Sequence, residues 1–260
     1  MTDEATPAWL YPRAAIALCL PFASEPILHP ELDALSSRLR RLSSTVVSDV
    51  LDRAGFPHRS LSAAIRPLAL GMKFAGAAAC FSGVTVYGES SGVKTLSPFE
   101  IDRAGANGVV IVIGMNGHTM SAAIGGLMCL ALKRRGCAGV VVDGGARDVG
   151  EIVDLALPVF CRYATPLISA GRWALTGAHT PIRVAGQASD SVEIAPDDLI
   201  IGDADGVVVI PQAIAADIVS WAEKVAEIEE AIASRLREGE TREAMFAAHP
   251  RFAHIRRLRE

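Results

Sequence analysis

The spacing of hydrophobic residues changes along the chain, and each change predicts a different element. Between Glu31 and Ala54 the apolar positions recur at helical spacing and are interrupted by a Ser/Thr cluster at 43–45. This pattern predicts two helices, the second of which ends at Gly55. Small-residue and continuous apolar runs are typical of buried strands, which we expect at 74–88, 108–114, 138–144 and 157–163.

The second half of the chain alternates between glycine-rich turns and regular patterns. A helix with a basic last turn is expected at 125–136, alternating and turn-rich hairpins at 181–211, and a long amphipathic helix at 213–239. The first of these helices lies between two strands, which makes a βαβ centre. The order of elements predicts an α/β fold with layers around a mixed sheet, and not a regular eight-fold barrel.

Domain organisation follows from the same patterns, since no internal repeat or low-complexity linker divides the chain. We expect one α/β domain at 31–240, an N-terminal arm at 1–30 and a C-terminal tail at 241–260. The apolar stretch after Arg13 is too short to span a bilayer, and Asp3 and Glu4 precede it, so a secretory signal is disfavoured. These features predict a cytoplasmic protein with no membrane partner.

Composition narrows the classes of partner. Half of the residues are hydrophobic, 21% are charged, and the net charge is −4. No basic patch interleaved with aromatic residues is present, which disfavours a nucleic-acid partner. The five cysteines are scattered without a C-x-x-C pair, so we interpret them as buried small residues in a reducing compartment and not as zinc ligands or disulfides.

The stretch "GVVVDGGARDVGEI" at 139–152 carries the candidate chemistry. Glycines 125 and 126 open the preceding helix and leave the backbone N–H groups of Leu127 and Met128 accessible to an anion. The next strand is expected to end at Asp143, so that the loop after it meets the start of the helix at one sheet edge.

In that loop Arg147 offers a planar fork for a carboxylate, while Asp148, Glu151 and Asp143 offer oxygens for a divalent cation. The alternative is that Arg147 and Asp148 form an ordinary surface ion pair. His118, in "MNGHTM", is a further candidate for contact with the pocket, against the alternative of an ordinary loop histidine.

The segment "GGLMCLALKRRGCAGVVVDGGARDVGEI" resembles the family of RraA-like proteins and 4-hydroxy-4-methyl-2-oxoglutarate/4-carboxy-4-hydroxy-2-oxoadipate (HMG/CHA) aldolases. The family signature is Gly, twenty residues, Arg-Asp, two residues, then Glu or Asp, and Gly126, Arg147, Asp148 and Glu151 match it. The resemblance covers roughly 33–240 and includes "SSTVVSDVLDRAG", "FAGAAACFSG", "LPVFCRYATP" and "PDDLIIGDADGVVVIP".

The resemblance implies roles for these residues. Arg147 and the amides of Leu127 and Met128 hold the carboxylate of a small 2-oxo acid, and Asp148 is the direct protein ligand of Mg²⁺ or Mn²⁺. Other metal ligands are waters oriented by acids, one of them from a neighbouring subunit of a homotrimer or dimer of trimers. That acid is expected in the last long helix, where Glu229 is preferred over Glu223, Glu227 and Glu230.

One position departs from the family pattern, because the aldolases commonly carry Asp or Glu where this chain has Gly126. The favoured hypothesis is a class II, metal-dependent pyruvate aldolase or oxaloacetate decarboxylase-like lyase, which forms a metal-stabilised enolate. The alternative is a non-catalytic RraA-like regulator that binds an RNA-degrading enzyme.

Overall fold

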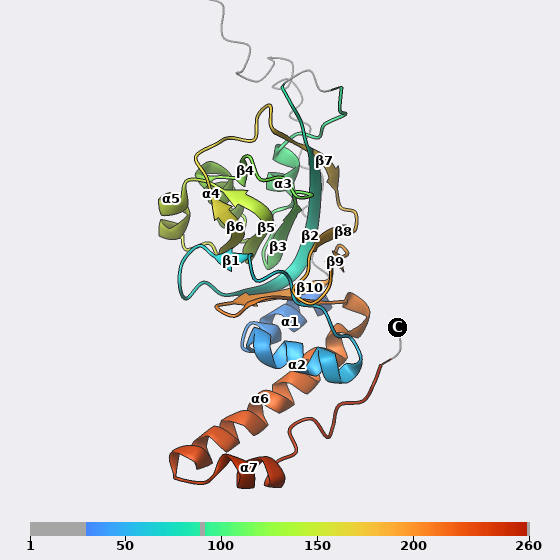
Figure 1. Ribbon diagram of the computed structural model, residues 1–260, viewed down its shortest axis with the longest axis vertical. Helices are drawn as coiled ribbons and strands as arrows, with labels where there is room; N and C mark the ends of the chain where they lie inside the picture. Colours follow the sequence, from blue (N-terminus) through green and yellow to red (C-terminus); the bar gives the residue numbers. More distant parts are fainter. Residues whose placement is uncertain (1–29, 89–91, 259–260) are drawn as a thin grey trace, which may run out of the picture.

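The computed structural model describes residues 30–88 and 92–258, which form a layered α/β fold around a mixed sheet (Figure 1). Within these residues the sheet has nine strands, with the order β1-β6-β5-β3-β2-β10-β11, while β4 pairs with β5 and β7 pairs with β2. The predicted N-terminal arm lies outside the described residues, except for Pro30.

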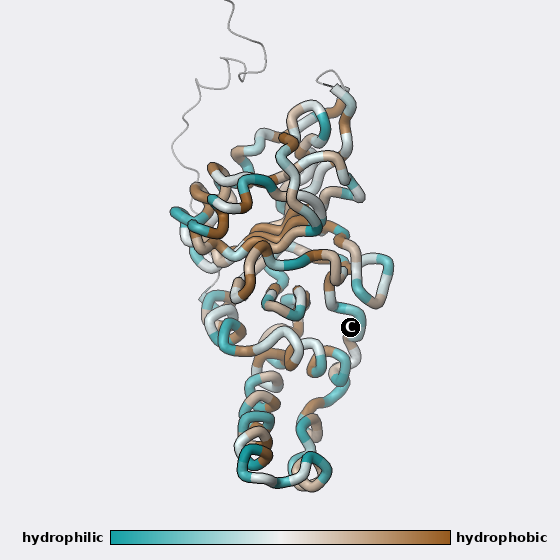
Figure 2. The backbone as a smooth tube through the Cα atoms, turned by 60° about the vertical axis from the view of Figure 1, so that its left-hand side comes forward, coloured by the Kyte–Doolittle hydropathy of each residue, from teal (hydrophilic) through white to brown (hydrophobic). Residues whose placement is uncertain are grey.

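Four parallel strands make the centre of the sheet, and they are the four predicted from the apolar runs. They are β2 (Phe74–Thr85), β3 (Val109–Gly114), β5 (Gly139–Ala146) and β6 (Val159–Ala164). All residues of β3 and β5 are buried, which explains why their sequences are continuous apolar runs without alternation. Figure 2 shows these strands as a hydrophobic centre.

Shorter strands extend this centre. The antiparallel additions are β1 (Arg66–Pro67), β7 (Trp173–Ala178), β10 (Leu199–Asp203) and β11 (Gly206–Ile210), and β4 (Ala122–Ile124) pairs in parallel with β5. A separate hairpin consists of β8 (Ile182–Ala185) and β9 (Ser191–Ile194). The hairpins predicted at 181–211 are therefore confirmed.

Three helices pack below β10 and β11 in Figure 1: α1 (Pro30–Leu39), α2 (Ser44–Ala54) and α6 (Ala215–Arg237). The side chain of Ser43 accepts a hydrogen bond from the Val46 N–H at 3.3 Å and caps α2, and Gly55 ends it in the left-handed conformation at φ 98°. Both predicted helices and the break between them are confirmed. A 3₁₀ turn, η2 (Gln212–Ile214), leads into α6.

The two faces of the central strands are covered differently. Helices α3 (Phe99–Ala104), α4 (Gly126–Arg134) and α5 (Val149–Asp154) follow strands on one side, where Leu132 and Ile152 join the core. The β8–β9 hairpin covers the other side, with Ile182 and Val184 packed near Val141. This arrangement leaves the beginning of α4 beside the end of β5.

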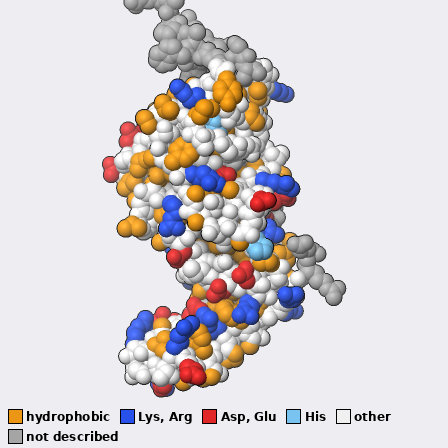
Figure 3. All heavy atoms as spheres, in the orientation of Figure 1, with side chains coloured by type: hydrophobic (Ala, Val, Ile, Leu, Met, Phe, Trp, Pro, Cys, Tyr) orange, Lys and Arg blue, Asp and Glu red, His pale blue; other side chains and the backbone are white. Residues whose placement is uncertain are grey.

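The end of the chain folds back onto the helices. Helix α7 (Arg242–Ala248) lies in the region predicted as a tail, and the Leu258 N–H donates to the Ala54 carbonyl at 2.9 Å. Figure 3 shows many charged side chains on the projecting end formed by α6 and α7.

The predicted α/β class, the mixed sheet and the long C-terminal helix are confirmed. One boundary that matters for the site was wrong, because β5 continues beyond Asp143 to Ala146. Small side chains at Gly144, Gly145 and Ala146 let the buried strand run on, and the next segment starts only at Arg147.

Candidate functional site

The register of β4 and β5 explains why residues about twenty positions apart meet. The two strands are parallel, with Ile124 opposite Ala146, and the Arg147 N–H donates to the Ile124 carbonyl at 3.0 Å. The next residues of the two strands, Gly125 and Arg147, therefore leave the sheet side by side. The spacing of the motif corresponds to the helix and the strand that lie between these two residues.

At positions 125 and 126, side chains of the site occupy the space that a Cβ would take. A Cβ on Gly125 would lie 2.7 Å from Asp148 Oδ2 and 2.9 Å from Arg147 Nε. A Cβ on Gly126 would lie 2.2 Å from Glu151 Oε2. The glycine pair thus accommodates the side chains of Arg147, Asp148 and Glu151, in addition to exposing the start of the helix.

The first turn of α4 presents free backbone donors. Gly125 precedes the helix without a side-chain cap, and the first amide within the helix to bond back is that of Cys129, which donates to the Gly125 carbonyl at 3.0 Å. The Gly126 N–H donates to Asp148 Oδ2 at 3.0 Å. Among the described residues the N–H groups of Leu127 and Met128 have no protein acceptor, as an anion site at a helix N-terminus requires.

Arg147 and Asp148 form an ion pair, which was the alternative interpretation of the sequence. Arg147 Nε lies 3.5 Å from Asp148 Oδ2, and about a third of each side chain is exposed. The terminal nitrogens of Arg147 have no hydrogen-bond partner within residues 30–88 and 92–258. Asp148 has φ 60° and ψ 41°, a left-handed conformation that is uncommon for a non-glycine residue and costs conformational energy.

Of the three predicted metal ligands, Asp148 and Glu151 lie together and Asp143 lies apart from them. The side chains of Asp148 and Glu151 both lie over Gly126. Asp143 does not join them: its carboxylate forms an ion pair with Arg162 and accepts a hydrogen bond from the Ala185 N–H of β8 at 3.3 Å. The side chains of a strand alternate between its faces, so Asp143 is on the face of Val141, opposite α4.

The structure therefore does not bring Asp143 together with Asp148 and Glu151, as the predicted shared metal site requires. In the part of the chain that the structure describes, no group of three or more His, Cys, Asp or Glu side chains is arranged to hold a metal ion.

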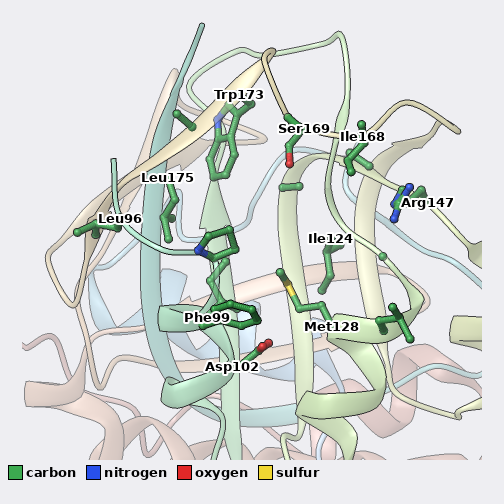
Figure 4. A pocket seen from close by; sticks show the side chains of 18 of the residues that line it. Leu96, Phe99, Asp102, Ile124, Met128, Arg147, Ile168, Ser169, Trp173 and Leu175 are labelled. Atoms are coloured by element: carbon green, nitrogen blue, oxygen red, sulfur yellow. The ribbon is translucent and has the colours of Figure 1, made fainter. Parts of the chain in front are cut away.

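A cavity of about 650 Å³ opens beside this glycine pair (Figure 4). Arg147 lies at one end, while Leu96 and Leu175 lie at the other, and Met128 and Ile124 stand between them. Its lining also includes Gly125 and Leu127, so the first turn of α4 and Arg147 line one concave space with mainly apolar walls.

His118 lies elsewhere. It is 3% exposed, its Nδ1 is 2.9 Å from Thr85 Oγ1, and its Nε2 is 2.8 Å from Ser121 Oγ. Burial lowers its pKa, which favours the neutral ring. Because both ring nitrogens are engaged and the residue does not line the cavity, the structure does not support the predicted contact with substrate.

Glu229 is also far from the glycine pair within the chain. It lies on α6 and forms an ion pair with Arg251 of the C-terminal segment. Its carboxylate therefore has a partner in its own chain, and the structure places it with the helices below the sheet and not at the candidate site (Figure 1).

Sequence reasoning missed the far wall of the cavity. This wall comes from the segment before α3 and from β7, with Leu96, Phe99, Trp173 and Leu175 as its large side chains. The alternation in "RWALTGA" was the available signal for β7, because Trp173 and Leu175 are buried and their neighbours are less so. Nothing in the motif itself points to these residues.

The described cysteines agree with the sequence interpretation. Cys80, Cys129, Cys137 and Cys161 are buried and free, and burial raises their pKa values to about 11 or 12. They are thiols in the core and not nucleophiles. No helix among the described residues has the length and apolar character needed to cross a membrane.

Comparison with known proteins points to one family. The family described as RraA-like (Aldolase/RraA) matches residues 44–209. A putative 4-hydroxy-4-methyl-2-oxoglutarate aldolase from Halalkalibacterium halodurans is 32% identical over 194 residues, which cover 75% of this chain and 84% of that protein. A 4-hydroxy-4-methyl-2-oxoglutarate aldolase from Thermus thermophilus is 30% identical over 128 residues, 46% of this chain and 74% of that protein.

Among solved structures, RraAS2 from Streptomyces coelicolor, described as an unusual member of the RNase ES inhibitor RraA protein family, superimposes with a TM-score of 0.68. It is 29% identical, and the match covers 81% of this chain and all of that one. An uncharacterised protein from Pseudomonas syringae has a TM-score of 0.71 at 24% identity, covering 82% of this chain and 96% of that one, which is a likeness of fold alone.

Proposed function

This chain belongs to the RraA-like (Aldolase/RraA) family, and from that premise we propose that it is a divalent-metal-dependent lyase that cleaves a 4-hydroxy-2-oxo acid and releases pyruvate. A lyase of the aldolase type agrees with the names of its relatives. The metal, the substrate and the decarboxylation of oxaloacetate are parts of the proposal.

The observation that carries the proposal is that Arg147 and the first turn of α4, where the amides of Leu127 and Met128 have no acceptor among the described residues, line the same cavity. A carboxylate bound there would receive hydrogen bonds from a cationic fork and from a helix N-terminus together. Arg147 then holds the C1 carboxylate, and the 2-oxo group beside it is directed towards Asp148.

The residues present fit a Mg²⁺ or Mn²⁺ ion. Asp148 and Glu151 supply hard carboxylate oxygens over the same glycine, and Mg²⁺ in proteins is commonly held by one or two carboxylates with several waters retained. A divalent cation bound there would polarise the 2-oxo group as a Lewis acid and offset the negative charge that develops on its oxygen.

The side chains of the site account for the remaining steps. In the retro-aldol direction the 4-hydroxyl loses its proton, the C3–C4 bond breaks, its electron pair forms the enolate of pyruvate, and C4 becomes a carbonyl. Protonation at C3 then gives pyruvate. We assign the carboxylate of Glu151, which lies over Gly126 next to Asp148, to the acceptance of the hydroxyl proton through a water. Loss of carbon dioxide from oxaloacetate yields the same enolate.

The test is pyruvate release from 4-hydroxy-2-oxo acids and from oxaloacetate, with Mg²⁺ or Mn²⁺ and with a chelator. We expect chelation to stop release and Asp148→Ala to lower kcat/KM by roughly 100-fold or more, while Arg147→Ala mainly raises KM. Asp190→Ala and Arg183→Ala remove exposed charges outside the cavity and are the matched controls. Absence of turnover of every such acid by metal-loaded protein would refute the lyase.

A second function is favoured by the likeness to RraAS2. On this hypothesis the chain binds an RNA-degrading enzyme and inhibits it without any reaction of its own. Direct binding of the full chain to an RNase E-type enzyme, with inhibition of RNA cleavage that persists in Arg147→Ala and Asp148→Ala, would support the regulator. Inhibition that is absent at saturating concentrations would exclude it.

A further inference from the structure

The cavity is much larger than the end that would hold a 2-oxo carboxylate. It extends from Arg147 past Ile124 and Met128 to Leu96 and Leu175, whose hydrocarbon side chains Figure 4 shows at the far end. A volume of about 650 Å³ lies within the roughly 300–1,000 Å³ range of small-molecule sites. The part beyond Arg147 is therefore available for the other end of the same molecule.

The walls of this part are apolar and firmly held. Ile101, Ile124, Trp173 and Leu175 are each less than a tenth exposed and belong to the hydrophobic core that α3 and α4 share with the sheet. Met128 and the more exposed Phe99 and Ile168 add to the apolar lining. Because the core fixes the four buried side chains, this part of the cavity cannot collapse onto a small ligand without disturbing the packing.

The charges of the cavity are distributed unequally. Among the described residues that line it, Arg147 is the only Lys, Arg or His, and Asp102 is the only acid. Asp102 Oδ1 is buried and has no hydrogen-bond partner within the described chain, and burial raises the pKa of this carboxyl group. The described lining beyond Arg147 thus offers hydrocarbon, one acid and the neutral polar groups of Thr95, Ser169 and Trp173, with no second cation.

A second carboxylate on the substrate would be poorly accommodated there. It would lose its water in a largely apolar space, and Arg147, the only cationic side chain among the described lining residues, would already be bound to the first carboxylate. An alkyl or aryl group would instead gain from leaving water for the same walls.

We propose that the substrates of this lyase carry an uncharged, apolar group at C4, branched alkyl or aryl, and that the cavity beyond Arg147 holds it. This inference rests on the proposed function, and it departs from the carboxylate-bearing substrate named for the relatives. The distal group is recognised by its hydrophobicity and size, and the C1 carboxylate and 2-oxo group by Arg147 and α4.

Binding of unreactive 2-oxo acids tests the inference independently of catalysis. Two probes form a matched pair: 2-oxoglutarate and 5-methyl-2-oxohexanoate, which has an isopropyl group in place of the distal carboxylate. Titration calorimetry on the full chain with Mg²⁺ present is expected to give at least tenfold tighter binding of the isopropyl compound, because an apolar pocket discriminates strongly between the two. Equal or tighter binding of 2-oxoglutarate, or binding of neither, overturns the inference.

A cation placed at the far end should reverse this preference. Leu96 is partly buried and lines the end opposite to Arg147. We expect Leu96→Arg to weaken binding of 5-methyl-2-oxohexanoate and strengthen that of 2-oxoglutarate, each by about tenfold. Leu70→Arg makes the same substitution at a 94% exposed side chain outside the cavity, and the wild-type preference should remain. An unchanged preference in Leu96→Arg contradicts the assignment of the cavity.

Turnover separates this inference from the proposed function. If neither 4-hydroxy-2-oxo-4-phenylbutanoate nor 4-hydroxy-2-oxoglutarate releases pyruvate but the apolar probe still binds more tightly, the lyase is refuted and the apolar site stands. If both react and 4-hydroxy-2-oxoglutarate has the higher kcat/KM, the lyase stands and the apolar preference is refuted.

Discussion

At the scale of single residues, the Glu151 carboxylate occupies space that a side chain at position 126 would need. The position where aldolases of this family commonly carry an acid is a glycine here, and the carboxylate of Glu151 lies where a Cβ on that glycine would stand. Glu151 is exposed and its side chain is long, so it can move away if the volume is filled. We infer that the missing acid at 126 and the placement of Glu151 are linked.

Gly126→Ala tests this link. Alanine is the better helix residue, so stability should not fall, and the melting temperature is expected to stay level or rise slightly. The methyl group displaces Glu151, and kcat/KM for pyruvate release should fall as much as in Glu151→Ala. In the double variant the two losses should not add, because each removes the same placement of one carboxylate. Additive losses would show that the residues act separately.

Asp102 gives the protein a pH-dependent stability. Its pKa in the folded protein is raised, mainly by burial, while Arg135 and Arg103 act in the opposite direction. The folded state therefore holds the proton more tightly than the unfolded state, and stability is lost as pH rises from the usual carboxyl range through the raised pKa. Asp102→Asn removes this loss.

Urea unfolding at pH 4 and pH 7 measures the effect. The free energy of unfolding of Asp102→Asn minus that of the wild type should be higher at pH 7 than at pH 4, because only the wild type loses stability over this range. The same difference at both pH values would mean that Asp102 does not titrate differently on folding.

At the scale of elements, a helix or strand was predicted correctly where neighbouring residues in the sequence define it. It was missed where contacts with distant parts of the chain define it. The two N-terminal helices were predicted with their break because a serine cap and a glycine stop are features of neighbouring residues. Elements α3, β1, β4 and β7 were missed because they have two to six residues each and are fixed by the larger elements they contact. The site depends on one of them, because β4 positions Gly125 next to Arg147.

The cap of α2 offers a stability test for a local signal. Ser43→Ala removes the acceptor for the Val46 N–H and is expected to lower the free energy of unfolding by about 1 kcal/mol. Ser43→Asp keeps an acceptor and should stay close to wild type. Urea unfolding measures both, and an alanine variant as stable as the wild type would show that water replaces the cap without cost.

At the scale of the whole molecule, the C-terminal segment is held to the helices by a network around Arg251. Its guanidinium pairs with Glu229 and lies 4.6 Å and 4.8 Å from the ring centroids of Phe246 and Phe252. It also opposes the upward shift that burial imposes on the pKa of Asp49 of α2. One side chain thus connects α2, α6 and the residues after α7.

Arg251→Ala should lower the free energy of unfolding by roughly 1–2 kcal/mol, since a partly buried ion pair and two cation–π contacts are lost together. Arg256→Ala removes an exposed arginine nearby and should change stability by less than about 0.5 kcal/mol. Chemical unfolding gives both values. If the two variants are equally stable, the contacts around Arg251 contribute nothing net.

The sequence by itself determined the class of fold, the central strands, the long helices and the motif from Gly126 to Glu151, because these are encoded in hydrophobic spacing, caps and short-range order. Only the tertiary structure decided which of the candidate residues meet. It turned Asp143 to the other face with Arg162, engaged both nitrogens of His118, and paired Glu229 with Arg251. It also formed the cavity walls from segments distant in sequence, because a pocket is defined by packing between elements and no single element's pattern contains it.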